Sequence, residues 1–184
     1  MKRSIILMLV VLFAGCANLE SIEKLEAYPE LYTLHNLHPD MKNNRLYTVN
    51  YQQQNLLIPV CTKVRLTDYG KKRVTFVAEP DNRQYHYFYY KRVREPLVEH
   101  IPGVFGPECP KKEIAALSEI DRKGIKKGVA LPGMTKQGVL YAMGKPPIHM
   151  TPSTQSQNWM YWANRWKRFV VVFDENDLVE RIQR

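Results

Sequence analysis

The sequence lacks the short motifs that mark common catalytic and phosphate-binding sites. It contains no G-x-S-x-G, H-E-x-x-H or C-x-x-C motif and no glycine-rich phosphate loop. No evident nucleophile or paired carboxylate stands beside its five histidines. These absences argue against an enzyme, although residues that meet only in the folded chain escape a motif search. A hydrolase would require a cleft that joins His86 or His100 to a carboxylate. No cofactor and no metal site are predicted.

Long apolar runs are also scarce. Residues 5–13 follow two basic residues and are too few to span a membrane, a pattern typical of a signal peptide. The sequence F-A-G-C at residues 13–16 resembles a bacterial lipobox, in which Cys16 is acylated through its sulfur and becomes the new N-terminus. Two or three acyl chains would anchor the protein stably, and Ala17 favours sorting to the outer membrane. The alternative is an ordinary signal peptide with a chance cysteine.

Cysteine is rare, with three in 184 residues. If Cys16 carries lipid, Cys61 and Cys109 remain, and an oxidising periplasm would allow them to pair. Their bond would enclose 47 residues and contribute about 4 kcal/mol at most by loop entropy. The alternative is two buried free thiols, because Cys61 ends the apolar segment I-P-V-C.

Acidic residues are outnumbered by basic ones. The chain has 27 Lys and Arg against 18 Asp and Glu, a net charge of +9. Such an excess either serves solubility or attracts anionic lipid headgroups, lipopolysaccharide phosphates or acidic proteins. Nucleic acid is not an expected partner, because the signal directs the chain out of the cytoplasm. The basic clusters lie at residues 71–73, 91–94, 111–112, 126–127 and 165–168.

Residues 16–40 are predicted to form a tether that includes a short helix before Pro29. His35 and His38 are three residues apart, but no further ligand has supporting spacing. We therefore expect solvated loop histidines here rather than a metal site.

Residues 41–95 have the composition of a small β module. Segments rich in β-branched and aromatic residues alternate with turn signals, which predicts an antiparallel barrel or curled sheet, similar in outline to SH3-like domains. The predicted strands are residues 46–51, 56–58, 62–67, 73–78 and 85–90. In the last strand, one row of side chains is expected in the core and the other against the C-terminal region. The alternative for these aromatic rows is a platform for glycan or peptide. The two rows are Tyr85, Tyr87 and Tyr89 on one face and His86, Phe88 and Tyr90 on the other.

Residues 96–110 form a predicted connector with four prolines. Apolar residues at positions 114, 117 and 120 then predict one helix that starts at Pro110 or Ser118 and extends toward Lys123.

A second helix is predicted to follow Thr135, whose hydroxyl can cap its first turn, and to end at Gly144 before Pro146. Gly138 is a poor interior residue that costs about 1 kcal/mol against alanine. Either tertiary packing holds this helix, or another group approaches Gly138 closely.

Antiparallel strands are predicted to follow this helix. Trp159 and Tyr161 share one face of the first strand, while Met160 and Trp162 share the other. Turn signals at residues 164–165 and 174–177 separate the strands. Residues 169–173 are apolar on both faces, so both faces should be covered, one by the helix and the other by the rest of the chain or a partner.

The pattern G-M-T-K-x-x-V-L-x-x-x-G-x-P, followed by a Trp/Tyr strand, F-x-V-x-F and an acidic turn, resembles the SmpA/OmlA (BamE-like) lipoprotein family over about residues 120–184. Gly138 and Pro147 depart from the pattern. The resemblance implies two helices on a three-stranded antiparallel sheet. It also implies a role like that of the family's best-known member, an accessory subunit of the outer-membrane β-barrel assembly machine. The matching positions are Gly133, Met134, Thr135, Val139, Leu140, Gly144, Pro146, Trp159, Tyr161, Phe169, Val171 and Phe173.

Together these patterns predict an α+β protein. The predicted function is a non-catalytic binding or scaffold subunit, anchored to the outer membrane and facing the periplasm, in cell-envelope or outer-membrane protein assembly. The alternative is an envelope lipoprotein that binds peptidoglycan or another glycan through the β module. The candidate partner-binding residues are the aromatic side chains Trp159, Tyr161, Trp162 and Trp166, because such residues dominate interface energy. The predicted divisions are a signal peptide (1–15), the tether (16–40), the β module (41–95), the connector (96–110) and a BamE-like domain (111–184).

Overall fold

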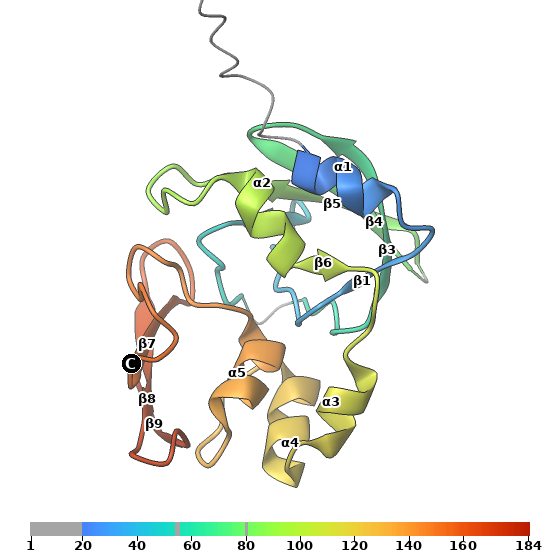
Figure 1. The fold of residues 1–184 in the computed structure, drawn as a ribbon. Helices are drawn as coiled ribbons and strands as arrows, with labels where there is room; N and C mark the ends of the chain where they lie inside the picture. The colour runs from blue at the N-terminus through green and yellow to red at the C-terminus, as the bar shows by residue number, and fades with distance from the viewer. Residues whose placement is uncertain (1–19, 54–55, 80) are drawn as a thin grey trace, which may run out of the picture.

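The computed structural model describes residues 20–53, 56–79 and 81–184, which form two packed units of α+β structure (Figure 1). The first, residues 20–106, is called the β unit, and the second, residues 111–184, the C-terminal unit. In the described part of the chain, no helix is long and apolar enough to cross a membrane. The predicted signal peptide and the acylation site at Cys16 lie outside the described residues.

The β unit is built on a curled six-stranded sheet that resembles half of a barrel. The strands follow the order β2-β5-β4-β3-β1-β6. The β3–β4 and β4–β5 pairs form a meander whose alternating apolar residues face one core. The strands are β1 (Leu31–Thr33), β2 (Arg45–Tyr47), β3 (Lys63–Tyr69), β4 (Arg73–Ala78), β5 (Arg83–Phe88) and β6 (Phe105–Gly106).

The predicted β module is correct in being a curled sheet but wrong in being wholly antiparallel. Strand β2 runs parallel to β5, with Leu46 opposite Tyr87. The chain leaves β2 through a long connection rather than a hairpin, and only a long connection allows a parallel neighbour. The predicted strand at residues 56–58 is absent as well. Within this segment Ile58 makes one isolated bridge, to Leu37, instead of a strand pairing.

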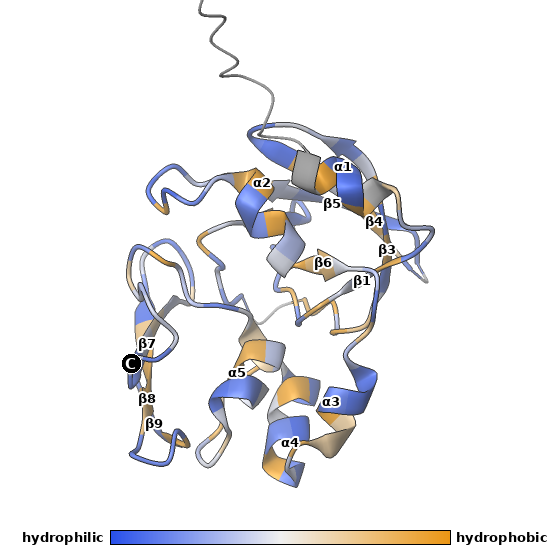
Figure 2. Cartoon of the chain, viewed as in Figure 1, coloured by the Kyte–Doolittle hydropathy of each residue, from blue (hydrophilic) through white to orange (hydrophobic). Residues whose placement is uncertain are grey.

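The predicted tether and connector are both parts of the β unit, so residues 20–40 and 96–106 are not linkers. Helix α1 (Glu20–Glu26) packs against α2 (Leu97–His100) and the 3-10 turn η1 (Ile101–Gly103) (Figure 1). Both helices carry hydrophobic residues (Figure 2), and Ile22 of α1 is fully buried in the core of the β unit. Strands β1 and β6 pair with each other at the sheet edge. Burial of apolar side chains outweighs the proline content that suggested a connector. The buried hydrophobic side chains from these two segments include Ile22, Leu25, Leu31, Leu37, Leu97, Val98, Ile101, Val104 and Phe105.

The C-terminal unit packs its helices on one face of an antiparallel three-stranded sheet with the order β7-β8-β9. In this sheet Trp159 lies opposite Val171, and Tyr161 lies opposite Phe169. The elements are α3 (Lys111–Ala116), α4 (Glu119–Lys127), α5 (Lys136–Met143), β7 (Asn158–Trp162), β8 (Arg168–Phe173) and β9 (Val179–Gln183). Their shared core comprises Ile125, Met134, Val139, Ala142, Met143, Trp159, Tyr161, Val171, Phe173 and Val179.

The single helix predicted between the connector and Lys123 is two helices. Both start signals are used, since Pro110 precedes α3 and Ser118 caps α4. Leu117 between them has an extended backbone, and the Ser118 hydroxyl accepts the Asp121 amide at 3.1 Å. A serine that starts a new helix in this way interrupts the preceding one.

The helix predicted after Thr135 is confirmed as α5. The Thr135 hydroxyl accepts the Gly138 amide at 2.9 Å, and Gly144 ends the helix with φ +71°. A close neighbour also explains Gly138. A side chain there would come within 2.6 Å of Cγ of Asp121, whose buried carboxylate accepts the Thr135 amide at 2.8 Å. Glycine therefore lets α5 approach α4 closely.

Amide side chains of the β unit bind the carboxyl end of α5. The last carbonyls of a helix have no partner within it, and here Asn50 donates to Met143 O at 2.8 Å while Gln52 donates to the same oxygen at 3.0 Å. Asn36 donates to Ile125 O of α4 at 2.6 Å. These hydrogen bonds, two of them buried, fix the orientation of one unit on the other.

A disulfide joins Cys61 of the β unit to Cys109, two residues before α3. Their Cα atoms are 4.9 Å apart, within the usual range for such a bond. The disulfide is thus a covalent connection between the units in addition to the backbone, and it lies at the start of the C-terminal helices.

Candidate functional site

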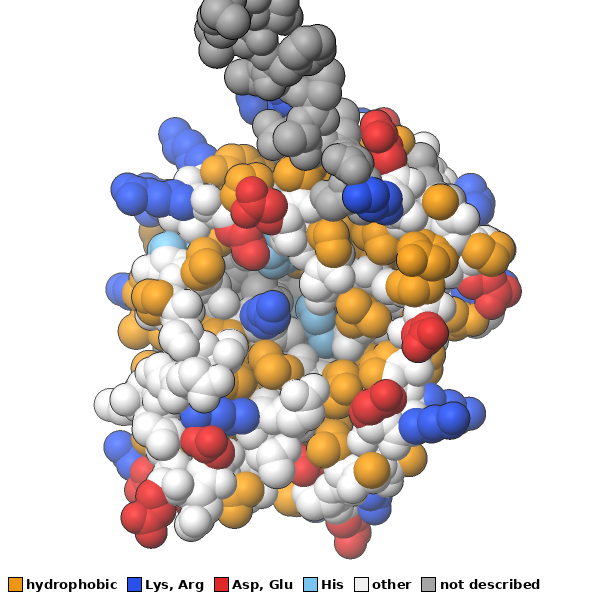
Figure 3. Space-filling view, in the orientation of Figure 1, with side chains coloured by type: hydrophobic (Ala, Val, Ile, Leu, Met, Phe, Trp, Pro, Cys, Tyr) orange, Lys and Arg blue, Asp and Glu red, His pale blue; other side chains and the backbone are white. Residues whose placement is uncertain are grey.

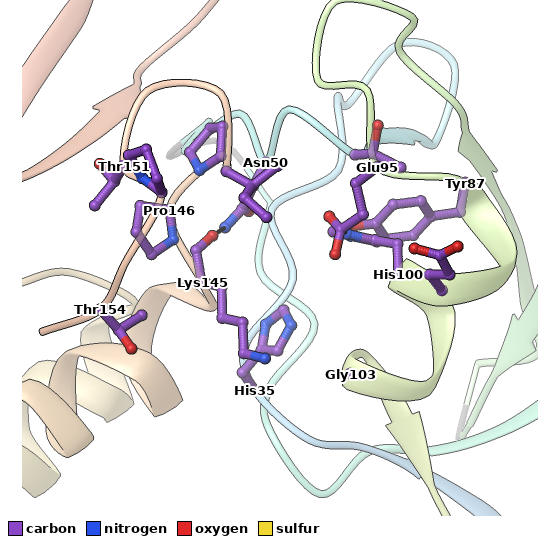
Figure 4. Close-up of a pocket in the computed structure, with 15 residues that line it drawn as sticks. His35, Asn50, Tyr87, Glu95, His100, Gly103, Lys145, Pro146, Thr151 and Thr154 are labelled. Carbon is purple, nitrogen blue, oxygen red and sulfur yellow. Dashed lines mark hydrogen bonds and ion pairs between the residues drawn. The ribbon is translucent and has the colours of Figure 1, made fainter.

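A polar cleft of about 290 Å³ lies where the two units meet. It is visible as a hollow in the space-filling view (Figure 3), and its side chains are drawn in Figure 4. The β unit contributes one wall and the floor, and the segment after α5 contributes the other wall. The lining residues are His35, Thr48, Asn50, Tyr87, Glu95, Glu99, His100, Gly103, Lys145, Pro146, Pro147, Ile148, Thr151, Pro152 and Thr154.

One wall of the cleft carries a hydrogen-bonded chain of three side chains. His100 Nδ1 lies 2.8 Å from Oε2 of Glu95, and its Nε2 lies 2.9 Å from the Tyr87 hydroxyl. Strand β5 supplies Tyr87, α2 supplies His100, and the loop between them supplies Glu95. Figure 4 shows this chain across the cleft from Lys145.

The protonation of the two ends of this chain follows from their surroundings. Burial raises the pKa of Tyr87 well above its usual range, so its hydroxyl keeps its proton and donates to Nε2 when the His100 imidazole is neutral. The hydrogen bond from His100 lowers the pKa of Glu95. Glu95 is therefore an ionised acceptor for the Nδ1 proton. The effect of the chain is to hold one carboxylate in a fixed orientation at the cleft wall.

His35 forms part of the cleft floor as a neutral imidazole. Burial lowers the pKa of His35 to about 4. Its Nδ1 lies 2.8 Å from the Asn36 carbonyl, which can only accept, so Nδ1 carries the proton. Lys145, which lines the same cleft, is exposed. At neutral pH the positive charge on this side of the cleft thus comes from the lysine.

The prediction that His35 and His38 are solvated loop histidines is wrong. They are 9% and 2% exposed, because the segment that carries them packs between the units. His38 contacts the Gln53 and Ala142 carbonyls, and burial lowers its pKa. Among the described residues, no group of three or more His, Cys, Asp or Glu could hold a metal ion.

Two of the four predicted partner-binding residues lie in the core. Trp159 and Tyr161 are fully buried, because the face of β7 that carries them packs under the helices. The Trp159 indole donates to Ser156 O at 3.0 Å, and the Tyr161 hydroxyl donates to Gly144 O at 2.8 Å. Both are therefore structural, and their assignment to a partner surface is corrected.

The other two predicted residues remain accessible to different degrees. Trp162 is half-buried at the strand end that meets Tyr51 of the β unit, and the Arg168 guanidinium lies 4.9 Å from its ring. Trp166 is 76% exposed in the β7–β8 turn, with the Arg165 guanidinium 4.4 Å from its ring. The four residues thus do not form one surface.

The cleft joins a histidine to a carboxylate, which is the arrangement that a hydrolase would require. The histidine is His100 and the carboxylate is Glu95. His86 contacts Thr75 instead. Sequence reasoning missed Glu95 and Lys145. The only signal for Glu95 was its place five residues before His100, and Lys145 had none, because a solvent-exposed lysine after a helix is common.

Compared with models of protein families, with curated proteins and with solved structures, this chain matches none of them.

Proposed function

We propose that this chain is a periplasm-facing lipoprotein of the bacterial outer membrane that acts as a non-catalytic binding or scaffold subunit in envelope assembly. The lipobox at residues 13–16 supports the anchor. The disulfide between Cys61 and Cys109 supports an oxidising compartment. An arrangement of two helices, α4 and α5, with the three strands β7, β8 and β9 is compatible with the BamE-like resemblance.

The observation that carries a binding role is the exposure of Trp166. Among the large hydrophobic side chains of the described residues it is the most exposed, and at interfaces tryptophan supplies a large share of the binding energy. Arg165, Lys167 and Arg168 surround it in the sequence, and all three are exposed. Because the turn is both aromatic and basic, the partner surface it fits is an acidic patch with an apolar centre on another envelope protein.

Affinity purification of the tagged full-length chain from detergent-solubilised membranes tests this proposal. Subunits of the β-barrel assembly machine should co-purify with the wild type, and Trp166→Ala should reduce their recovery by about tenfold, the effect of losing one interface hot spot. Met41→Ala is the matched control, because Met41 is 64% exposed on the other unit. Equal recovery with both variants, or no recovery with the wild type, would contradict the proposal.

The anchor is tested separately by Cys16→Ser. This variant should leave the membrane fraction, since a chain without acyl groups has no apolar attachment. Retention of the unmodified variant in outer membranes would show that another feature holds the protein there.

A second candidate function is binding of peptidoglycan or a related polar envelope polymer. The observation that favours it is the polar cleft, whose lining combines hydroxyl, amide and charged groups in the way ligand sites do. Retention of the full-length chain on purified sacculi tests it. Loss of retention in Glu95→Gln would assign the binding to the cleft, whereas no retention of the wild type would exclude this function.

A further inference from the structure

The cleft continues into a second hollow along the edge of the β unit. The second hollow is shallower, with a volume of about 610 Å³, and shares Glu95, Glu99 and Ile148 with the first. Its other lining residues include Arg92, Arg94 and His149. The two hollows form one groove, called here the interunit groove, that runs from Lys145 to the two arginines.

The charges along the interunit groove alternate. Lys145 lines only the first hollow, the carboxylates of Glu95 and Glu99 line both where the hollows join, and Arg92 and Arg94 line only the second. Figure 3 shows acidic side chains on the rim of the hollow, with a basic side chain inside it and others beyond the rim. The groove therefore has a negative centre between two positive ends.

The negative centre is preorganised. Oε2 of Glu95 is held by His100, whose other nitrogen is held by the buried hydroxyl of Tyr87. Oε1 of Glu95 makes no hydrogen bond with the residues that the structure describes. The side chains of His100 and Glu95 are 13% and 28% exposed. A carboxylate held in this way loses little conformational freedom when it accepts a hydrogen bond from a ligand.

We propose that the interunit groove binds a short peptide that carries a primary ammonium group between two carboxylates. The ammonium lies against Glu95 and Glu99, one carboxylate pairs with Lys145, and the other pairs with Arg92 and Arg94. This inference uses the cleft of the second candidate function, but it rests on the charges of the interunit groove. It is therefore tested first with a soluble peptide, without any polymer.

A charged peptide fits the groove better than a neutral glycan does. A neutral ligand would cover these charged side chains without pairing them, and a charge that loses water without gaining a partner costs affinity. The enclosed part of the groove, about 290 Å³, is at the small end of the range for ligand sites. Such a volume suits a ligand of about two or three residues.

Calorimetric titration of the full-length chain in detergent tests the inference, with N-acetyl-Glu-Lys-Ala as the probe peptide. The same peptide with an acetylated lysine lacks the ammonium, and the peptide with a C-terminal amide lacks one carboxylate. The probe should bind at least about tenfold more tightly than either control peptide, because each loses one charge-assisted contact. Equal affinities for the three peptides, or no binding of the probe at millimolar concentration, would overturn the inference.

Variants then assign each charge to its contact. Glu95→Gln and the more exposed Glu99→Gln should each weaken the probe but leave the acetyl-lysine peptide unchanged. Lys145→Gln should weaken peptides that carry both carboxylates, and Glu180→Gln and Lys71→Gln, both exposed and outside the groove, serve as matched controls. If the control variants weaken the probe as much as the groove variants do, the groove is not the site.

A binding measurement with purified sacculi distinguishes a peptide of the cell wall from a free peptide. Probe binding together with retention on sacculi, both lost in Glu95→Gln, supports a peptide of the cell wall. Probe binding without retention supports a free peptide and contradicts the second candidate function. Retention on sacculi without probe binding overturns the peptide inference and leaves a glycan as the ligand.

Discussion

The two units depend on contacts of different reach along the chain. In the C-terminal unit, β7, β8 and β9 lie in sheet order as they do in sequence. In the β unit, β1 and β6 are neighbours although more than 70 residues separate them. Local signals such as caps and turns are enough for the first arrangement, whereas the second depends on which distant segments bury surface together. The difference shows that a clear local pattern does not predict which distant segments of a chain pair with each other.

The largest expected effect is a difference in stability between variants of two tryptophans of the C-terminal unit. Trp159→Ala should reduce the free energy of unfolding by about 3 to 5 kcal/mol, because it leaves a large cavity in the core. Trp166→Ala should change it by less than about 0.5 kcal/mol, because that side chain is exposed. Urea denaturation followed by circular dichroism measures both. Similar losses in the two variants would contradict the burial of Trp159.

Removing the disulfide tests how far the two units depend on each other. The Cys61→Ser/Cys109→Ser double variant should lose about 4 kcal/mol of stability, because the unfolded chain regains the freedom of a loop closed over a separation of 48 residues. If the amide side chains of Asn36, Asn50 and Gln52 couple the units, thermal unfolding of this variant should remain a single transition. Two separate transitions would show that the covalent bond, not the amide contacts, makes the chain cooperative.

Acidification should act at the boundary between the units, through the buried imidazoles of His35 and His38. The pKa of His35 is about 4 in the folded protein and about 6.5 in the unfolded chain. As the pH falls below 6.5, the unfolded state binds this proton first, so stability present at pH 7 is lost progressively, by about 3 kcal/mol near pH 4. Denaturation curves at pH 7 and 4.5 measure the loss, which should be smaller in His35→Gln. An equal loss in that variant would assign the pH dependence to other groups.

The smallest effect concerns the packing of two helices. Gly138→Ala should be destabilising by about 1 to 2 kcal/mol, although alanine favours helix by about 1 kcal/mol, because the new methyl group would overlap the Asp121 carboxylate. Gly70→Ala is the control, since nothing lies within 4 Å of a side chain there. A Gly138→Ala protein that melts at a higher temperature than the wild type would show that α4 and α5 can separate without cost.

The sequence was most informative where neighbouring residues decide the structure. The Thr135 cap, the Gly144 end and the turn between β8 and β9 were predicted because their hydrogen bonds join residues close in the chain. The alternation along β7 correctly placed Trp159 and Tyr161 on one face, but periodicity does not say which face meets the core. Their assignment to a partner surface failed for that reason.

The sequence was least informative where distant segments meet. Ile22 and Phe105 lie in segments that looked like a tether and a connector, and both are fully buried. His35 looked solvated because no neighbour in sequence buries it. Glu95, His100 and Tyr87 come from a loop, a helix and a strand, and no spacing rule links them before the sheet and α2 are in place.

Composition and local pattern alone determined the charge balance, the α+β class and the helix around α5, because each depends on residue type or on contacts within a few positions. Tertiary structure alone decided the parallel β2–β5 pair, the burial of His35 and the cleft between the units. Each of these requires free energy from surfaces that become adjacent only after long loops close. In particular, the amides of Asn36, Asn50 and Gln52 satisfy helix carbonyls of the other unit, and that pairing positions the two walls of the cleft.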